Sequence, residues 1–158
     1  MSTTPKPCPD GYHSVTPYLF IDGAARAIEF YKQAFGAVEL FRMGTPGEKV
    51  AHAEIQIGDS RLMLADEFPD MGARGPKTIG GSPVNLMIYT EDVDTVFARA
   101  IADGATEVRP VKNQFYGDRS GCLTDPFGHS WTVATHVEDV PPDELERRMK
   151  EACPPPPQ

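Results

Sequence analysis

The sequence predicts an α+β fold built from two tandem βαβββ modules. The clearest observation is a pair of strand patterns, Asp118–Thr124 and Ser130–His136, joined by the turn sequence DPFG. Proline presets the first central turn position, and glycine accepts a positive φ. A weaker copy of this hairpin occupies residues 50–65. The segment AFGAVEL at 34–40 also returns as ADGATEV at 102–108, which indicates a duplicated module.

The first module covers residues 13–66. Residues 15–21 are apolar and β-branched, as in a strand. Ala24–Phe35 repeats apolar side chains at helical spacing, and Gly36 follows where a helix end favours glycine. A short strand at 38–42 and the weaker hairpin complete the βαβββ order.

The second module covers residues 83–140 and repeats the pattern with a strand at 84–90 and a helix at Val93–Ala102. A short strand at 106–109 leads through a connector to the DPFG hairpin. Residues 67–82 are rich in glycine and proline and read as a loop that links the modules. Each module alone leaves one sheet face bare, so we expect the two to share a core or to curl around a cleft.

The flanking segments are expected to differ from the modules. Residues 1–12 have the composition of a disordered segment, and residues 153–158 read as a free proline-rich tail. Residues 141–152 place acidic side chains before basic ones, which suits a helix dipole. The three cysteines have no CxxC spacing, so we expect free thiols rather than disulfides or a zinc site at Cys8, Cys122 and Cys153.

The amino-acid composition restricts the kinds of partner that the protein is expected to bind. The chain has a net charge of −8 and a pI near 4.9, which argues against nucleic acid or an anionic membrane surface. No apolar run approaches the ~20 residues of a membrane helix. The N-terminal sequence lacks the apolar core of a secretion signal, so a cytoplasmic protein is expected.

Five segments carry a family resemblance when read in order: AIEFYKQAFGA, AHAEIQIGD, YTEDVDTVFARA, YGDRSG and DPFGHSWTVATH. Together they resemble the glyoxalase/bleomycin-resistance/extradiol-dioxygenase superfamily, also called the vicinal oxygen chelate superfamily, and within it the PhnB-like branch. The resemblance covers about residues 14–140. It implies that each module curls its sheet into half of a cup that holds a ligand. It also implies a homodimer, since the cups of this family are often completed across an interface, or else a tightly closed monomer.

The resemblance further implies where a metal would bind in the metal-dependent members. The four family positions fall, within one residue, on Thr16, Leu62, Asn85 and Thr132. Neither these residues nor their neighbours are histidine, cysteine or carboxylate, the usual donors for a divalent metal. We therefore expect a cup with no metal and no cofactor.

His52 and Glu54 are the first candidate site residues. They alternate with apolar residues along one strand and so share one face with Gln56. In one interpretation they line the cup, with His52 as an acid or base that Glu54 orients. In the other they belong to a solvated outer face.

Tyr116, Asp118 and Arg119 form the second candidate group. A guanidinium can hold a carboxylate or phosphate with two hydrogen bonds, and Asp118 could orient Arg119 for this. The alternative is an internal Asp118–Arg119 pair that only ties the hairpin to its connector. If Arg119 and His52 line opposite walls of one cup, the ligand should be anionic or polar aromatic.

Aromatic residues supply the remaining candidates. Trp131, the only tryptophan, reads either as a core residue or as a platform for a ligand. Tyr89 and Phe20 occupy matching strand positions and could wall an apolar pocket. No role is assigned to His13, His129 or His136.

The function expected from these observations is binding of a small organic molecule, as in drug sequestration. The alternative is a lyase, isomerase or dioxygenase of the same superfamily. Such an enzyme would use a divalent metal at displaced ligands, or His52 as its acid or base. The sequence leaves the choice between binder and enzyme open.

Overall fold

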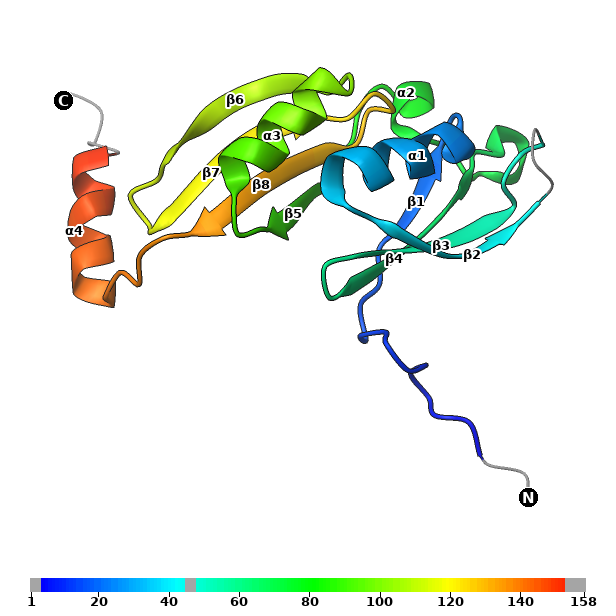
Figure 1. Ribbon diagram of the computed structural model, residues 1–158, viewed down its shortest axis with the longest axis horizontal. Helices are drawn as coiled ribbons and strands as arrows, with labels where there is room; N and C mark the ends of the chain where they lie inside the picture. The colour runs from blue at the N-terminus through cyan, green and yellow to red at the C-terminus, as the bar shows by residue number, and fades with distance from the viewer. Residues whose placement is uncertain (1–3, 45–47, 153–158) are drawn as a thin grey trace. The chain divides into compact units, whose positions relative to one another are not determined.

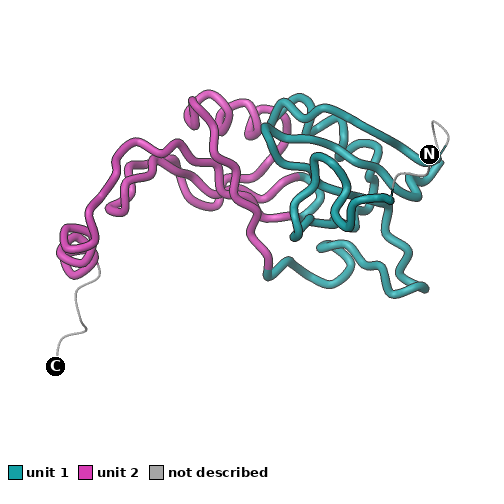
Figure 2. The backbone as a smooth tube through the Cα atoms, turned by 90° about the horizontal axis from the view of Figure 1, so that it is seen from below, with its two compact units in different colours: residues 1–83, 126–128 teal, residues 84–125, 129–158 magenta. Residues whose placement is uncertain are grey.

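The computed structural model describes residues 4–44 and 48–152, and the chain divides into two compact units (Figure 2). The first comprises Met1–Pro83 with Pro126–Gly128, and the second comprises Val84–Asp125 with His129–Gln158. Each unit contains one four-stranded mixed sheet and a helix that packs on it (Figure 1). The predicted fold of two tandem βαβββ modules is therefore confirmed.

The first unit has its strands in the spatial order β1-β4-β3-β2, with β1 parallel to β4 and the other pairs antiparallel. Its elements are β1 (Tyr18–Ile21), α1 (Ala24–Phe35), β2 (Val38–Met43), β3 (His52–Ile57), β4 (Ser60–Asp66), η1 (Pro69–Met71) and α2 (Pro76–Ile79). The last two lie in the segment predicted to be loop. Each is a single short turn that begins with proline and ends at a glycine. A turn of this length is too short to show helical periodicity in the sequence.

A buried carboxylate ties the start of α1 to the sheet. Asp66, at the end of β4, accepts hydrogen bonds from the backbone N–H groups of Gly23 and Ala24, both at 3.0 Å. Its second oxygen accepts from the N–H of Val50 at 2.6 Å. The other end of α1 stops at Gly36, which has the left-handed φ of 69° that glycine tolerates.

The alternation along β3 separates two faces of this sheet. Ala53, Ile55 and Ile57 are buried on the side of α1, and His52 and Glu54 point the other way. We call this second side the α1-distal face. Its side chains are those of Tyr18, Phe20, Val38, Phe41, Met43, His52, Glu54, Gln56, Arg61 and Met63.

The second unit repeats the arrangement, with strand order β5-β8-β7-β6 and only the β5–β8 pair parallel. Its elements are β5 (Asn85–Tyr89), α3 (Val93–Ala102), β6 (Thr106–Asn113), β7 (Asp118–Thr124), β8 (Ser130–His136) and α4 (Pro142–Ala152). β6 runs through the segment that the sequence suggests is a connector. It is an edge strand with two irregularities in its pairing, so it accommodates Pro110.

Helix α3 covers one face of the second sheet. Its N-terminus is capped by Asp92, whose side chain accepts the N–H of Thr95 at 3.0 Å. Gly121 lies directly under the helix, because a Cβ there would come within 2.8 Å of the Phe97 ring. The face of this sheet away from α3, here the α3-distal face, carries Asn85, Met87, Tyr89, Asp118, Ser120, Cys122, Ser130, Thr132, Ala134 and His136.

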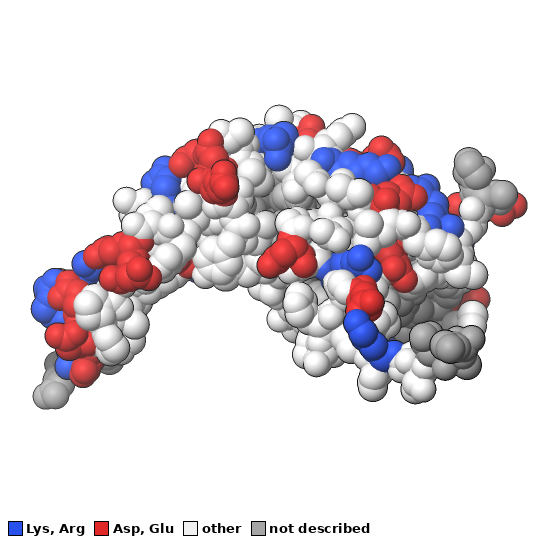
Figure 3. Space-filling model, turned by 60° about the horizontal axis from the view of Figure 1, so that its bottom comes forward, with Lys and Arg blue, Asp and Glu red and all other residues white. Residues whose placement is uncertain are grey.

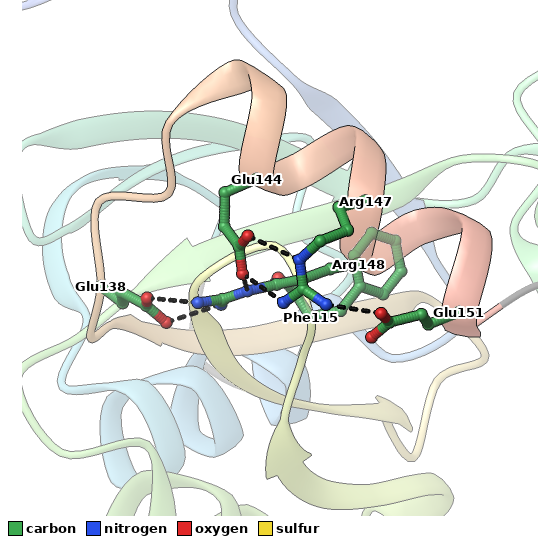
Figure 4. A network of polar contacts seen from close by, with 6 residues as sticks. All are labelled: Phe115, Glu138, Glu144, Arg147, Arg148 and Glu151. Carbon is green, nitrogen blue, oxygen red and sulfur yellow. Dashed lines mark hydrogen bonds and ion pairs between the residues drawn. The ribbon is translucent and has the colours of Figure 1, made fainter.

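Helix α4 has no buried residue and is attached by charged side chains (Figure 4). Arg148 donates to Glu138 with two hydrogen bonds of 2.7 and 2.8 Å and to Glu144 at 2.6 Å. Acidic and basic side chains both lie along this helix (Figure 3). Within residues 4–44 and 48–152, no helix combines the length and apolar character needed to cross a membrane.

Two of the three cysteines lie in the part of the chain that the structure describes. Cys8 and Cys122 are free thiols. Cys153 and the proline-rich tail lie outside the described part of the chain, as do residues 1–3 at the other end.

Candidate functional site

His52 lies among aromatic rings on the α1-distal face. Its Nδ1 is 2.8 Å from the Tyr18 hydroxyl, and its Nε2 is 3.4 Å from a Glu54 oxygen. The ring centroids of Tyr18 and Phe41 are 5.6 and 6.3 Å from that of the imidazole. The side chains of His52 and Glu54 are only 23% and 24% exposed. Both side chains are therefore partly buried on the α1-distal face.

Tyr12 approaches the same face from the N-terminal segment. Its hydroxyl donates a hydrogen bond to Glu54, and the Arg61 guanidinium lies 5.0 Å from the centroid of its ring. Arg61 in turn donates to the backbone oxygen of Asp10 at 3.0 Å. The hydrogen bond from Tyr12 lowers the pKa of Glu54, whereas partial burial and Glu54 together raise the pKa of Tyr12 to about 12.

No pattern in the sequence signals this contact. The segment before the first strand reads as disordered, and Tyr12 reaches Glu54 across 42 positions of the chain. Only the folded sheet brings the two residues together.

The α3-distal face holds a second cluster around the buried carboxylate of Asp118. The hydroxyl of Tyr89 donates to one Asp118 oxygen at 3.0 Å, and Nδ1 of His136 is 2.8 Å from the other. The remaining ring nitrogen of His136 is 2.9 Å from Asp139. No pattern in the sequence assigns His136 a role. The signal that could have found it is its register, because Asp118 and His136 lie directly opposite each other on β7 and β8.

Arg119 lies on the other face of the same strand. Neighbours on a strand point to opposite sides, so Arg119 reaches α3, where it makes two hydrogen bonds of 2.7 Å to Asp94. It also donates to Asn113 at 3.1 Å. The alternative interpretation, an internal Asp118–Arg119 pair, is therefore wrong, because each residue has other partners. Contact between Arg119 and a ligand stays a prediction, but its guanidinium already holds a carboxylate.

The change Arg119→Ala should leave the melting temperature close to that of the unaltered protein. The side chains of Arg119 and Asp94 are 35% and 56% exposed, and ion pairs in such positions contribute little to stability because water screens them. Thermal unfolding followed by circular dichroism measures this. A collapse of the melting temperature would show instead that Arg119 closes a buried network.

Trp131 and Tyr116 occupy contrasting places. Trp131 is 1% exposed and lies on the α3 side of β8. Thr135 marks this side, because its hydroxyl accepts a hydrogen bond from the N–H of Val93 at the start of α3. Trp131 shares this face with Thr135. Its indole N–H donates to the buried Asp125 at 2.9 Å. The structure thus gives Trp131 a core position. Tyr116 lies in the β6–β7 turn and is exposed.

The residues at the family's metal positions do not fit a divalent metal. Leu62 is buried on the α1 side, so its neighbours Arg61 and Met63 hold the α1-distal positions on β4. On the α3-distal face, Thr132 donates to Asn85 at 3.1 Å, a pair of neutral side chains. Among the residues that the structure describes, no three histidine, cysteine or carboxylate side chains are grouped to hold a metal.

His136 should titrate above the ordinary histidine pKa of about 6.5. Hydrogen bonds to Asp118 and then to Asp139 favour the charged ring and raise its pKa. The stabilisation from these contacts is complete below the unfolded-state value and is lost as the pH rises through the folded-state pKa. NMR titration of the ring protons measures it, and Asp118→Asn should lower the pKa. A value at or below 6.5 would contradict the contact with Asp118.

Comparison with known proteins identifies a family. The model of the Glyoxalase/Bleomycin resistance protein/Dioxygenase superfamily matches residues 11–133. A protein of Mycobacterium tuberculosis is 42% identical over 139 residues, which cover 86% of this chain and 82% of that protein. A protein of Arabidopsis thaliana is 30% identical over 115 residues, 68% of this chain and 69% of the relative.

Solved structures show the same fold. The X-ray structure of an Arabidopsis thaliana gene product has a TM-score of 0.63 at 26% identity and covers 78% of this chain and 98% of its own. TioX from Micromonospora sp. ML1 has a TM-score of 0.61 at 22% identity, covering 82% and 100%. The fosfomycin resistance protein FosX from Mesorhizobium loti has a TM-score of 0.58 at 17% identity, covering 78% and 91%.

Proposed function

Because the chain belongs to the glyoxalase/bleomycin resistance protein/dioxygenase superfamily, we propose that it binds a small polar aromatic molecule on its α1-distal face. One observation supports this most directly. A histidine–glutamate pair, His52 and Glu54, is half-buried among the rings of Tyr18 and Phe41. Small-molecule sites combine apolar walls with a few well-placed polar groups in this way.

The chemistry of the face selects the class of ligand. The expectation of an anionic ligand rests on Arg119 together with His52, but Arg119 is paired with Asp94 on the α3 side of its sheet. The cation on the α1-distal face itself is Arg61, whose guanidinium lies over the Tyr12 ring and donates to the backbone oxygen of Asp10. Stacking on aromatic rings and hydrogen bonds to His52 and Glu54 suit a polar aromatic ligand. The hydrogen-bonding side chains of this face, His52 and Glu54, support binding without a metal. Sequestration of an aromatic drug would be one use of such a site.

A panel of single-ring compounds of different charge tests the proposal on the unaltered protein. Isothermal calorimetry measures affinity, and the ring signals of His52 in NMR spectra report the place of binding. We expect a neutral polar compound to bind, to shift the His52 signals, and to lose at least about tenfold in affinity in Phe41→Ala. Gln56→Ala, on the same face but at the other end of strand β3 from His52, is the matched control. Binding that leaves His52 and the Phe41→Ala affinity unchanged would contradict the proposal.

A second candidate is an enzyme that uses acid–base chemistry. The Asp118–His136 contact favours it, since a carboxylate that accepts from Nδ1 orients the imidazole and supports its charged form. His52, with Glu54 beside it, is the other candidate base. Turnover of a bound compound with a pH profile that His136→Gln or His52→Gln abolishes would establish this function. Binding without turnover in both variants and the parent would remove it.

We also propose that the protein is a homodimer. Edge strand β2 exposes Val38, Leu40 and Met43, and apolar side chains on an open edge favour pairing with another chain. Light scattering after size exclusion should give twice the chain mass of 17.3 kDa. A mass equal to that of one chain at micromolar concentration would contradict the proposal.

A further inference from the structure

The ring of Tyr12 lies on the α1-distal face as a ligand would. Residues 4–11 are exposed and contain no helix or strand, and Tyr12 is the half-buried residue that follows them. Its side chain makes two contacts that an aromatic ligand could also make at this part of the face. The hydroxyl donates to Glu54, and the ring lies under the guanidinium of Arg61.

The two ends of this contact recognise different parts of a phenol. Glu54 is a hydrogen-bond acceptor only, so it selects a hydroxyl and disfavours a phenolate or a carboxylate. Arg61 lies 5.0 Å from the ring centroid, within the range of a cation–π interaction, so it selects the aromatic face. His52, 3.4 Å from the other Glu54 oxygen, supports the carboxylate. A carboxylate and a guanidinium placed in this way form a site for a neutral phenol.

A tight turn at residues 9–12 places the Tyr12 ring in this site. The N–H of Tyr12 donates to the backbone oxygen of Pro9 at 3.1 Å, and Gly11 has a φ of 83° that favours glycine. A Cβ at Gly11 would lie 2.4 Å from the Arg61 guanidinium carbon, so the glycine also lets the turn approach that side chain. Because the rest of the segment is exposed, holding it in place costs chain entropy that the Tyr12 contacts must offset. Release of the segment would regain this entropy, which favours exchange of the Tyr12 ring for a free ligand.

We propose that Glu54 and Arg61 form a phenol-binding site that Tyr12 fills from within the chain, and that a free neutral phenol takes its place. This inference rests on the proposed binding function of the α1-distal face and adds the chemical class of the ligand. It also makes the N-terminal segment a competitor whose removal opens the site.

The test uses 4-methylphenol, the side chain of tyrosine as a free molecule, and the full-length variant Tyr12→Gly. Calorimetry should show that 4-methylphenol binds Tyr12→Gly about tenfold or more tighter than the unaltered protein, since the tethered ring no longer competes. Toluene, which lacks the hydroxyl, should show no such gain. Adding Glu54→Gln to Tyr12→Gly should weaken 4-methylphenol binding by about tenfold, as expected for a hydrogen bond to a charged group.

Two controls keep the result interpretable. His13→Gly loosens the same segment but keeps the Tyr12 ring, so it should not gain affinity for 4-methylphenol. A chain without residues 2–12 should bind 4-methylphenol as Tyr12→Gly does, which guards against a folding defect of the point variant. Circular dichroism checks the fold of each protein.

Equal affinity of Tyr12→Gly and the unaltered protein for 4-methylphenol would overturn the inference, as would binding that ignores Glu54→Gln. If another ring compound binds the unaltered protein and shifts His52 while 4-methylphenol fails on Tyr12→Gly, only the phenol assignment fails. If no compound of the panel binds any of these proteins, the proposed function fails as well.

Discussion

Replacing Trp131 by alanine is expected to lower the free energy of unfolding by about 3–5 kcal/mol, the range for removing a large aromatic side chain from a packed core. Trp131 is 1% exposed and pairs across the sheet with the buried Leu123. Its loss leaves a cavity beneath α3. It also leaves the Asp125 oxygen that accepts the indole N–H without that donor. Urea unfolding followed by far-ultraviolet circular dichroism measures the change.

Trp131→Phe is the matched control, because it keeps most of the ring volume and removes the indole N–H. We expect it to cost about 1–3 kcal/mol, the scale of losing one hydrogen bond to a charged acceptor. Trp131 is also a candidate ligand contact from the sequence, and the two variants separate the roles. A nearly unchanged unfolding free energy with loss of ligand binding would restore the ligand role and contradict the core position.

Replacing Asp66 by alanine is expected to cost about 3 kcal/mol or more, since buried donors left without an acceptor carry a desolvation penalty of about 1–3 kcal/mol each. Three backbone N–H groups, those of Gly23, Ala24 and Val50, lose their acceptor at once. These groups connect the start of α1 and the approach to β3 with the end of β4. The α1-distal face should therefore loosen together with the helix.

Asp66→Asn provides the control for this change. One amide oxygen can still accept from Gly23 and Ala24, whose hydrogen bonds share a single Asp66 oxygen, while the amide NH₂ cannot serve Val50. The loss should be smaller, at about 1–2 kcal/mol. Hydrogen exchange of the Ala24 and Val50 amides locates the effect. Equal stability of Asp66→Ala and the parent would contradict the role of this carboxylate as the tie between helix and sheet.

The two distal faces show how a duplicated module can diverge in chemistry. On the first sheet, His52 and Glu54 come from one strand and are surrounded by aromatic rings. On the second sheet, Asp118 takes its partners Tyr89 and His136 from two other strands. The shared backbone pattern supplies a bare sheet face in each module, and different side chains on it give each face its own hydrogen-bond network.

The helices and the second hairpin could be predicted because interactions between residues close in sequence set their bounds. The bounds of Ala24–Phe35 and Val93–Ala102 follow from apolar spacing and from the residues that start and stop a helix, so prediction and structure agree on both. The hairpin Asp118–Thr124 and Ser130–His136 follows from its alternation and from a turn that needs glycine, and Gly128 has the positive φ of 97°. The repeat of these patterns was sufficient for the fold class.

The sequence by itself determined the duplicated βαβββ fold and the grouping of His52 with Glu54, because both depend on periods that the chain carries locally. Only the tertiary structure decided which face each helix covers and which partner each charged side chain finds. Arg119 reaches Asp94, Asp118 reaches His136, and Tyr12 reaches Glu54 because strand register and packing bring distant positions together. The alternation of polar and apolar residues along a strand indicates which side chains share a face. The choice of face depends on where the helix packs, which is a property of the folded chain.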